Sequence, residues 1–184
     1  MFELPVNERL KLELLEPGHA SELYMLVDAN RDHLGTWMPW VENTKSTEDI
    51  LNFIKSGLNN YAMRNGFQLG LRFEQKLAGV LGLHYIDWDT GATEMGYWLD
   101  KKLEGKGLMT AAVSALLEKL FNHYKLNRVE IRANPANTRS RAIPKRLGFL
   151  EEGMLRQTGM NAGERFDMVV YGLLKEEWQL RRED

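Results

Sequence analysis

Cysteine is absent from the 184-residue chain, and its absence removes several kinds of chemistry at once. Without cysteine the protein has no disulfide framework, no thiolate nucleophile and no cysteine-ligated zinc site. The four histidines are His19, His33, His84 and His123, and their spacing matches no metal-binding pattern. The sequence therefore predicts a protein without a metal site.

Long hydrophobic runs and a strong excess of charge of one sign are also absent. The longest apolar runs fall well short of the roughly 18–20 residues that a membrane span needs, and the first residues lack the basic start and apolar stretch of a secretion signal. A net charge of −2 argues against a protein whose main task is to hold nucleic acid by its phosphates. We expect a cytoplasmic protein with neither a membrane nor a nucleic-acid partner.

The composition that remains is that of an ordinary globular domain. Hydrophobic residues make up 43% of the chain and charged residues 27%. The length lies within the range of one domain, roughly 100–200 residues. Because no repeat, low-complexity tract or linker divides the chain, we expect a single domain over residues 1–184.

Hydrophobic periodicity predicts an alternation of strands and helices. Strands are expected at Arg9–Leu15, Phe67–Phe73, Leu77–Ile86, Ala92–Leu99, Arg128–Ala133, Leu150–Arg156 and Phe166–Leu173. Helices are expected after Pro17, from Ser46 to the stop at Asn65, and at Leu108–Tyr124 and Thr138–Leu147. The strand–helix–strand order of residues 92–133 implies a parallel pair with a right-handed crossover. The predicted fold class is therefore α/β, a mixed sheet with helices on both faces.

A glycine-rich turn joins one of these strands to the long helix. Gly105 and Gly107 let the backbone bend so that successive N–H groups point into one concavity, with the positive end of the helix behind them. Lys102 and Lys106 add positive charge. This arrangement is typical of a phosphate or pyrophosphate site, although an ordinary strand–helix turn gives the same pattern.

Two familiar phosphate motifs do not fit this turn. A nucleoside-triphosphate P-loop requires glycine where Asp100 stands and serine or threonine at Gly107. A dinucleotide fingerprint requires a third glycine near Thr110 and a place after the first strand. Both interpretations are excluded.

The turn belongs to an ordered set of short motifs that covers essentially the whole chain. The motifs are Trp37–Val41, Glu94–Leu99, Gly105–Gly107, Asn127–Ile131, Asn137–Ser140, Leu147–Phe149 and Glu152–Gln157. In this order and spacing they resemble the GNAT family of N-acetyltransferases, and within it the RimJ/RimL-type ribosomal-protein-alanine N-acetyltransferases. The resemblance implies the GNAT acyl-CoA N-acyltransferase fold and acetyl-CoA as co-substrate.

The resemblance also implies where the coenzyme lies. The family's phosphate loop has Gln or Arg, two residues, Gly, one residue, then Gly or Ala. Lys102, Gly105 and Gly107 fall on these positions, so Lys102 is a departure. The resemblance extends the coenzyme-binding set to residues on either side of the loop. That set is Tyr97, Trp98, Leu99, Lys102, Gly105, Lys106, Gly107, Leu108, Met109 and Asn137.

The pantetheine arm is expected to pair along Tyr97–Leu99 like an added strand, with Asn137 contacting it from the other side. Ser140 matches the serine that protonates the departing thiolate in this branch. Many relatives use a tyrosine at the position of Pro144, so that alternative is excluded. A purely structural role for Ser140, as the N-cap of the short helix, stays open.

The general base is harder to assign. The glutamate of some relatives would fall at Gly159 or Met160, and no acid stands there. Glu94 is our candidate, although it is also explained as a rim residue bonded to a neighbour, and Asp87 and Asp167 are weaker candidates. An α-amine with a pKa near 7.7–8.0 is roughly a tenth to a sixth neutral at pH 7, whereas lysine is about one part in 2,500. A site without a strong base therefore suits an N-terminal amine.

The acceptor side of the site rests on the resemblance alone. Trp37 and Trp40 are expected to cover the acceptor pocket, although both are also explained as core residues. The basic segment 128–146 is a solvated face, a contact for the coenzyme 3′-phosphate, or a surface for a ribosomal partner. The predicted reaction is direct transfer to the α-amino group of a protein, with no covalent enzyme intermediate. A small-amine acetyltransferase, a non-catalytic acyl-CoA sensor and a homo-oligomer stay open.

Overall fold

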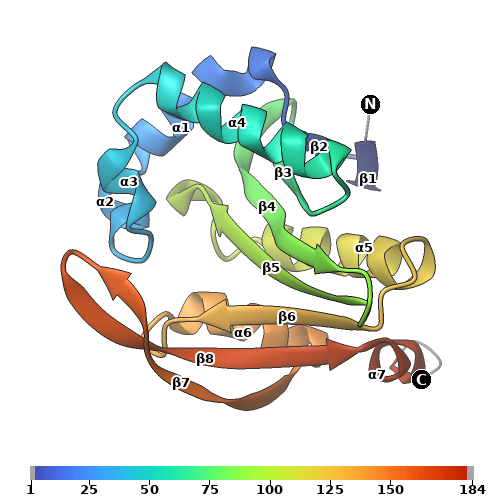
Figure 1. Cartoon of the computed structure of the whole chain (residues 1–184). Helices are drawn as coiled ribbons and strands as arrows, with labels where there is room; N and C mark the ends of the chain where they lie inside the picture. Colours follow the sequence, from blue (N-terminus) through green and yellow to red (C-terminus); the bar gives the residue numbers. More distant parts are fainter. Residues whose placement is uncertain (1–2, 182–184) are drawn as a thin grey trace.

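Eight strands form one mixed sheet in the order β1-β2-β3-β4-β5-β6-β8-β7 (Figure 1). The computed structural model describes residues 3–181. The strands are β1 (Glu3–Asn7), β2 (Leu10–Leu14), β3 (Phe67–Phe73), β4 (Lys76–Asp87), β5 (Ala92–Leu99), β6 (Arg128–Ala133), β7 (Leu150–Asn161) and β8 (Glu164–Leu174). The helices are η1 (Pro17–His19), α1 (Ala20–Ala29), α2 (Arg31–Gly35), α3 (Trp40–Asn43), α4 (Thr47–Ala62), η2 (Lys101–Leu103), α5 (Leu108–Asn122), α6 (Thr138–Leu147) and α7 (Lys175–Leu180).

The predicted fold class and the order of the main elements are confirmed. β5 and β6 form the predicted parallel pair, joined through α5, and the other neighbours in the sheet run antiparallel. Ser46 caps α4 through a capping box with Asp49, as the sequence pattern indicates. The chain thus folds as a mixed sheet with helices on both faces.

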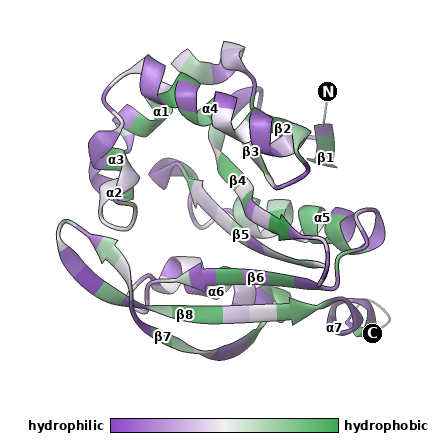
Figure 2. Cartoon of the chain, viewed as in Figure 1, coloured by the Kyte–Doolittle hydropathy of each residue, from purple (hydrophilic) through white to green (hydrophobic). Residues whose placement is uncertain are grey.

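Two hydrophobic clusters divide the helices between the two faces of the sheet. Residues of α5 and α6 pack on one cluster, which includes Met95 and Tyr97 of β5. Residues of α1 and α4 pack on the other, against Val80 and Trp98. Because side chains alternate along a strand, neighbouring residues of β5 point to opposite faces of the sheet. Figure 2 shows hydrophobic residues along β8 and α5, and hydrophilic ones on the outer turns of α1 and α4.

The parallel pair β5–β6 separates part-way along its length. The two strands pair only from Ala92, opposite Arg128, to Met95, opposite Ile131. Beyond Met95, β5 runs on to Leu99 while β6 turns away, so the edge of β5 that faces β6 loses its partner. Unpaired backbone N–H and C=O groups at such an edge are available to bind an extended ligand.

Several elements lie outside the sequence prediction. β1 contains Pro5, which is tolerated because β1 is an edge strand. The short helices α2, α3 and α7 carry too few residues to show a helical period. β7 continues to Asn161, beyond the predicted end at Arg156, with shifts of register between Leu155 and Gly159. Among residues 3–181, no helix combines the length and hydrophobicity that a membrane crossing requires.

Candidate functional site

A cleft of about 1030 Å³ opens where β5 and β6 separate. The end of β5, the glycine-rich turn, the first turns of α5 and α6, and the segment around Trp37 all contribute to its walls. Most of the residues predicted to bind the coenzyme meet there. They are Tyr97, Trp98, Leu99, Gly105, Gly107, Leu108, Met109 and Asn137.

The glycine-rich turn has the left-handed backbone that its sequence suggests. Gly105 and Gly107 both have φ of 75°, and a Cβ added to either would meet no atom within 4 Å. Gly107 is the N-cap residue of α5, and its carbonyl accepts a hydrogen bond from the N–H of Ala111. The first turn of α5, with Leu108 and Met109, faces the same cleft. This is a helix N-terminus with an open approach, and it favours an anion.

The end of β5 is held to α6 across the cleft. The Tyr97 hydroxyl donates a 2.9 Å hydrogen bond to the backbone carbonyl of Ser140. Burial raises the pKa of Tyr97, against the smaller opposing effect of that hydrogen bond, so the hydroxyl stays a donor at neutral pH. The contact fixes the distance between the unpaired edge of β5 and the N-terminus of α6.

Asn137, not Ser140, caps helix α6. The Asn137 side chain accepts a 3.1 Å hydrogen bond from the backbone N–H of Ser140. The alternative that Ser140 itself is the N-cap is therefore wrong, and Pro144 lies inside the helix rather than in its first turn. Within residues 3–181 the Ser140 hydroxyl has no hydrogen-bond partner, and the residue lines the cleft. Its hydroxyl is free to meet a ligand.

Tryptophans form the opposite wall of the cleft. Trp37 lines the cleft directly. Trp40 is not among the lining residues and instead packs against Trp98, with ring centroids 6.1 Å apart and planes tilted by 46°. The Trp40 side chain thus contacts a wall residue without lining the cleft itself, and the two predicted pocket residues take different positions.

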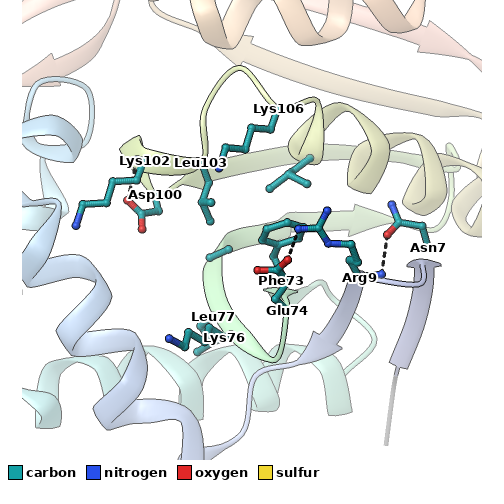
Figure 3. Close-up of a pocket in the computed structure, with 12 residues that line it drawn as sticks. Asn7, Arg9, Phe73, Glu74, Lys76, Leu77, Asp100, Lys102, Leu103 and Lys106 are labelled. Carbon is teal, nitrogen blue, oxygen red and sulfur yellow. Dashed lines mark hydrogen bonds and ion pairs between the residues drawn. The ribbon is translucent and has the colours of Figure 1, made fainter.

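Two lysines predicted to bind the coenzyme, Lys102 and Lys106, do not line this cleft. Lys102 and Lys106 line a separate hollow of about 690 Å³ together with Arg9 and Lys76 (Figure 3). The backbone N–H of Lys102 donates to the Asp100 carboxylate at 3.0 Å. Lys101 lines the cleft together with Glu104, Gly105 and Gly107, whereas Lys102 and Lys106 do not.

Two arginines of the basic segment 128–146, Arg139 and Arg146, line the cleft. Arg146 donates a 2.8 Å hydrogen bond to the Thr110 hydroxyl, which ties α6 to the first turn of α5. Arg139 forms an ion pair with Glu104, and Glu104 lies 3.0 Å from Nε2 of His33. Arg139 and Arg146 are seven residues apart, which is about two helical turns, so they lie on the same face of α6. This spacing was the signal in the sequence that could have distinguished them from the other basic residues of the segment.

The rest of the basic segment is occupied by internal ion pairs. Arg128 is held by Glu152 and Glu130, and these contacts raise its pKa despite partial burial. Arg141 and Lys145 both pair with Glu151. The segment is therefore not one uniform solvated face.

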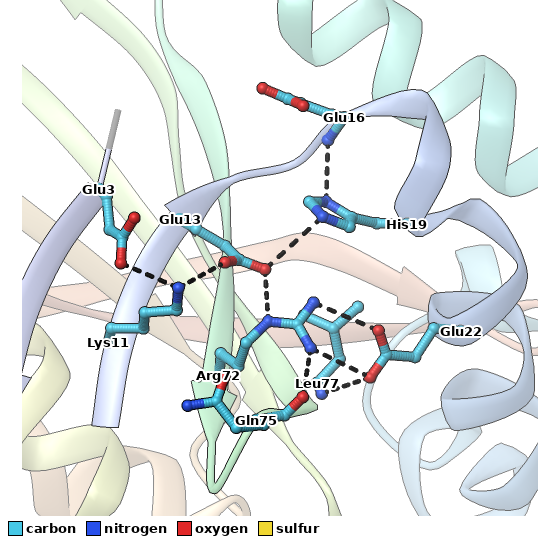
Figure 4. Close-up of polar contacts among 9 residues, drawn as sticks. All are labelled: Glu3, Lys11, Glu13, Glu16, His19, Glu22, Arg72, Gln75 and Leu77. Carbon is cyan, nitrogen blue, oxygen red and sulfur yellow. Dashed lines mark hydrogen bonds and ion pairs between the residues drawn. The ribbon is translucent and has the colours of Figure 1, made fainter. Parts of the chain in front are cut away.

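The four histidines lie in four separate places. His19 belongs to a network around Glu13 and Arg72 that joins β2 and β3 to the start of α1 (Figure 4). His33 faces Glu104, His84 faces Glu94, and His123 lies edge-on to Tyr124. In the part of the chain that the structure describes, no three His, Asp or Glu side chains are grouped as metal ligands.

Glu94 lies beside the cleft rather than among its lining residues. Its carboxylate is 3.0 Å from Nδ1 of His84 and 3.4 Å from Nε of Arg132. Desolvation raises the pKa of Glu94, but the His84 hydrogen bond and the electrostatic effects of His84 and Arg132 outweigh it and lower the pKa. Glu94 is therefore bonded to its neighbours, as the alternative interpretation expects, and its role as the base stays a prediction.

The model of the acetyltransferase (GNAT) domain family matches residues 9–150, which is more than half of the chain. The chain belongs to the GNAT acetyltransferase family. Its similarity to YdaF of Bacillus subtilis (strain 168) is 41% identity over 180 residues, covering 97% of this chain and 98% of YdaF. YdaF is provisionally named a ribosomal N-acetyltransferase.

Solved structures agree with this assignment. The microcin C7 self-immunity acetyltransferase MccE, in complex with acetyl-CoA and AMP, has 26% identity and a TM-score of 0.88, covering 92% of this chain and 94% of that one. RimL, a ribosomal L7/L12 alpha-N-protein acetyltransferase in complex with coenzyme A, has 24% identity and a TM-score of 0.92, covering 96% and 99%. The protein is thus an acetyl-CoA N-acetyltransferase with the GNAT fold.

The hydrogen-bonding groups in the cleft of this GNAT acetyltransferase suit acetyl-CoA. A diphosphate requires several converging N–H donors, which the turn at Gly105 and Gly107 and the N-terminus of α5 provide. An extended amide-containing arm requires backbone partners, which the unpaired edge of β5 provides.

Proposed function

We propose that this GNAT acetyltransferase transfers an acetyl group from acetyl-CoA to the α-amino group of a protein N-terminus, with a ribosomal protein as the acceptor. The observation that carries the proposal is the cleft itself, because it joins a diphosphate-type loop to an unpaired strand edge and a serine with a free hydroxyl. The names of YdaF and RimL support the acceptor class.

The coenzyme would extend along the cleft from the loop toward the point where β5 meets β6. In this placement the backbone N–H groups at Gly105, Gly107 and the first turn of α5 hold the diphosphate. Arg139, at the start of α6, and Arg146, near its end, add positive charge along the cleft. Lys102 and Lys106 contribute only long-range attraction, since they line the neighbouring hollow.

The inner part of the cleft would hold the thioester. The arm pairs along Tyr97–Leu99, whose free N–H groups polarise the thioester carbonyl and stabilise the oxyanion that forms on it. Asn137 and Ser140 approach from α6, and the Tyr97 hydroxyl sets their distance from β5. Ser140 is then placed to give its hydroxyl proton to the departing thiolate.

The acceptor would enter between the Trp37 segment and the β7–β8 hairpin. Nδ2 of Asn161, near the hairpin tip, donates hydrogen bonds of 2.9 Å and 3.0 Å to the carbonyls of Gly35 and Thr36. These bonds join the hairpin to the segment that follows α2 and form a bridge on the acceptor side. We place the peptide end under this bridge, with Trp37 as its apolar wall and Trp40 packed against Trp98.

An α-amine also fits the acid–base groups of the site. Among the described residues, the lining of the cleft contains one carboxylate, Glu104, and that carboxylate is already paired with Arg139. Because an α-amine is partly neutral at pH 7 and lysine is almost wholly charged, a weakly basic site acts much faster on an N-terminus. The Glu94–His84 pair is the proposed site at which the amine gives up its proton.

The acceptor is tested by incubating the protein with acetyl-CoA and three kinds of amine while free thiol release is followed. We expect peptides with a free N-terminus to be acetylated at least tenfold faster than the same peptides with a blocked N-terminus and an internal lysine. Peptides that begin with Ser or Ala and carry ribosomal-protein sequences should be the fastest. Mass spectrometry of the products assigns the acetylated nitrogen.

Two other outcomes of this panel would redirect the proposal. Preference for polyamines or amino-acid derivatives over every peptide would identify a small-amine acetyltransferase. Stabilisation by the coenzyme without turnover of any amine would identify a non-catalytic acyl-CoA sensor. In either case the N-terminal acceptor would be rejected.

A further inference from the structure

The imidazole of His84 covers a glycine at the point where β5 leaves β6. A Cβ built on Gly96 would lie 2.5 Å from Nε2 of His84, so a larger residue at this position would displace the ring. Gly96 follows directly on Met95, the last residue of β5 that pairs with β6. The ring therefore lies over Gly96, where the strands begin to separate, next to the cleft-lining residue Tyr97 in the sequence of β5.

The ring lies on the face of the sheet opposite to α5 and α6. Met95 and Tyr97 point into the cluster beneath α5, so Glu94, Gly96 and Trp98 point to the other face. That face is shared with α1 and α4 and adjoins Trp98, on which Trp40 packs. His84 is thus on the acceptor side of the strand along which the coenzyme arm is proposed to pair.

The two nitrogens of the His84 ring have different surroundings. Nδ1 is 3.0 Å from the Glu94 carboxylate, which favours the tautomer that carries its proton on Nδ1. Nε2 then presents a lone pair over Gly96. The His84 side chain is 53% exposed and the Glu94 side chain 16%, so an incoming amine can reach the ring more easily than the carboxylate.

Glu94 by itself is a poor proton acceptor. Its carboxylate faces His84 on one oxygen and Arg132 on the other, and these contacts lower its pKa. Other charged and titratable groups nearby are Glu130, which pairs with Arg132, and Tyr85, whose pKa burial and the two glutamates raise. These groups hold Glu94 in its charged form, which orients the ring.

We propose that His84 is a catalytic residue whose Nε2 accepts the proton of the acceptor ammonium, and that Glu94 is the positioning residue that holds the ring for this step. The proposal rests on the proposed function. It refines the expectation that Glu94 acts as the base directly.

The proton balance of the step is complete. Nε2 takes one proton from the ammonium, and the freed nitrogen lone pair forms a bond to the thioester carbonyl carbon. The carbon–sulfur bond then breaks, its electron pair leaves with the sulfur, and the Ser140 hydroxyl protonates that sulfur. The second nitrogen proton restores Ser140, through solvent where needed, and His84 later releases its proton to water. The products are an amide, a thiol and one proton.

The test is the pH dependence of kcat/KM for His84→Gln with an acceptor peptide that has a free N-terminus. Because an α-amine is only about a tenth to a sixth neutral at pH 7, we expect a loss of about tenfold there. At pH 9 the amine is neutral without help, and the loss should fall below twofold. His123→Gln is the matched control, since His123 is exposed near the end of α5, and it should follow the wild type at every pH.

Glu94→Gln provides a second, independent readout. If Glu94 acts through the ring, this variant lowers kcat/KM at pH 7, and the double variant with His84→Gln is no slower than His84→Gln alone. Coenzyme binding, measured by calorimetry, should be unchanged in all three variants. Additive losses in the double variant would overturn the positioning role.

Other results would overturn the catalytic role of His84. One is a loss below twofold at pH 7, and another is a loss of equal size at pH 7 and pH 9, which marks a structural effect. If the wild type is active and His84→Gln gives either of these two results, the catalytic role of His84 is rejected while the proposed function stands. A wild type that binds the coenzyme but acetylates no amine rejects the proposed function, and this role with it.

Discussion

Replacing Gly107 with valine should abolish measurable binding of acetyl-CoA, with a loss of at least 100-fold in affinity, or about 2.8 kcal/mol. Two physical effects act together at this position. Gly107 has φ of 75°, a conformation that a β-branched residue adopts only with strain. The added side chain would also enter space that is empty within 4 Å, on the cleft side of the loop where the diphosphate is proposed to lie. Titration calorimetry with coenzyme A measures the effect.

The matched control is Gly163→Val in the β7–β8 turn. Gly163 has φ of 80° and also leaves open space around an added Cβ, so the backbone strain is comparable. It does not line the cleft. We expect both variants to lose similar thermal stability while Gly163→Val keeps its coenzyme affinity. Equal coenzyme affinity in the two variants would contradict the assignment of the loop.

Ser140→Ala should lower kcat by about 100-fold while changing coenzyme affinity by less than threefold. The substitution removes the hydroxyl and leaves the hydrogen bonds of the Ser140 backbone in place. The Ser140 N–H still donates to Asn137, and its carbonyl still accepts from Tyr97, because both contacts involve the backbone. The site therefore keeps its shape, and any change in rate reports on protonation of the departing sulfur.

Steady-state kinetics and calorimetry on the same preparation separate these effects. Ser56→Ala, at an exposed position on α4, is the control for a serine-to-alanine change elsewhere and should behave as wild type. An unaltered kcat in Ser140→Ala would remove Ser140 from the mechanism. A parallel loss of coenzyme affinity would instead make Ser140 a binding residue.

The sequence was sufficient to predict the sheet, the parallel pair and the loop. Alternation in the strands and the helical period of α5 are strong local signals, and the two glycines mark a left-handed turn that few other residues permit. The predicted coenzyme-binding residues on β5 and at the N-cap of α6 meet because β5 and the start of α6 both border the place where β5 and β6 separate. That placement follows from topology.

The sequence was not sufficient to show which way polar side chains point. Lys102 and Lys106 flank the loop in sequence, yet they face the neighbouring hollow, because loop residues have no fixed periodicity. The sequence alone did not decide whether His84 faces the cleft or lies at the surface, bonded to a neighbour. Its position depends on Gly96 across the strand pair and on Glu94, and such cross-strand contacts appear only when the register of the sheet is known.

The most direct measurement is titration of the wild-type protein with acetyl-CoA by calorimetry, accompanied by thermal melting with and without the coenzyme. We expect one binding site per chain, measurable heat and a melting temperature that rises with coenzyme concentration, because a ligand that binds only the folded state stabilises it. Absence of heat together with identical melting curves would contradict the account, because every proposed role of the cleft requires the coenzyme to bind there.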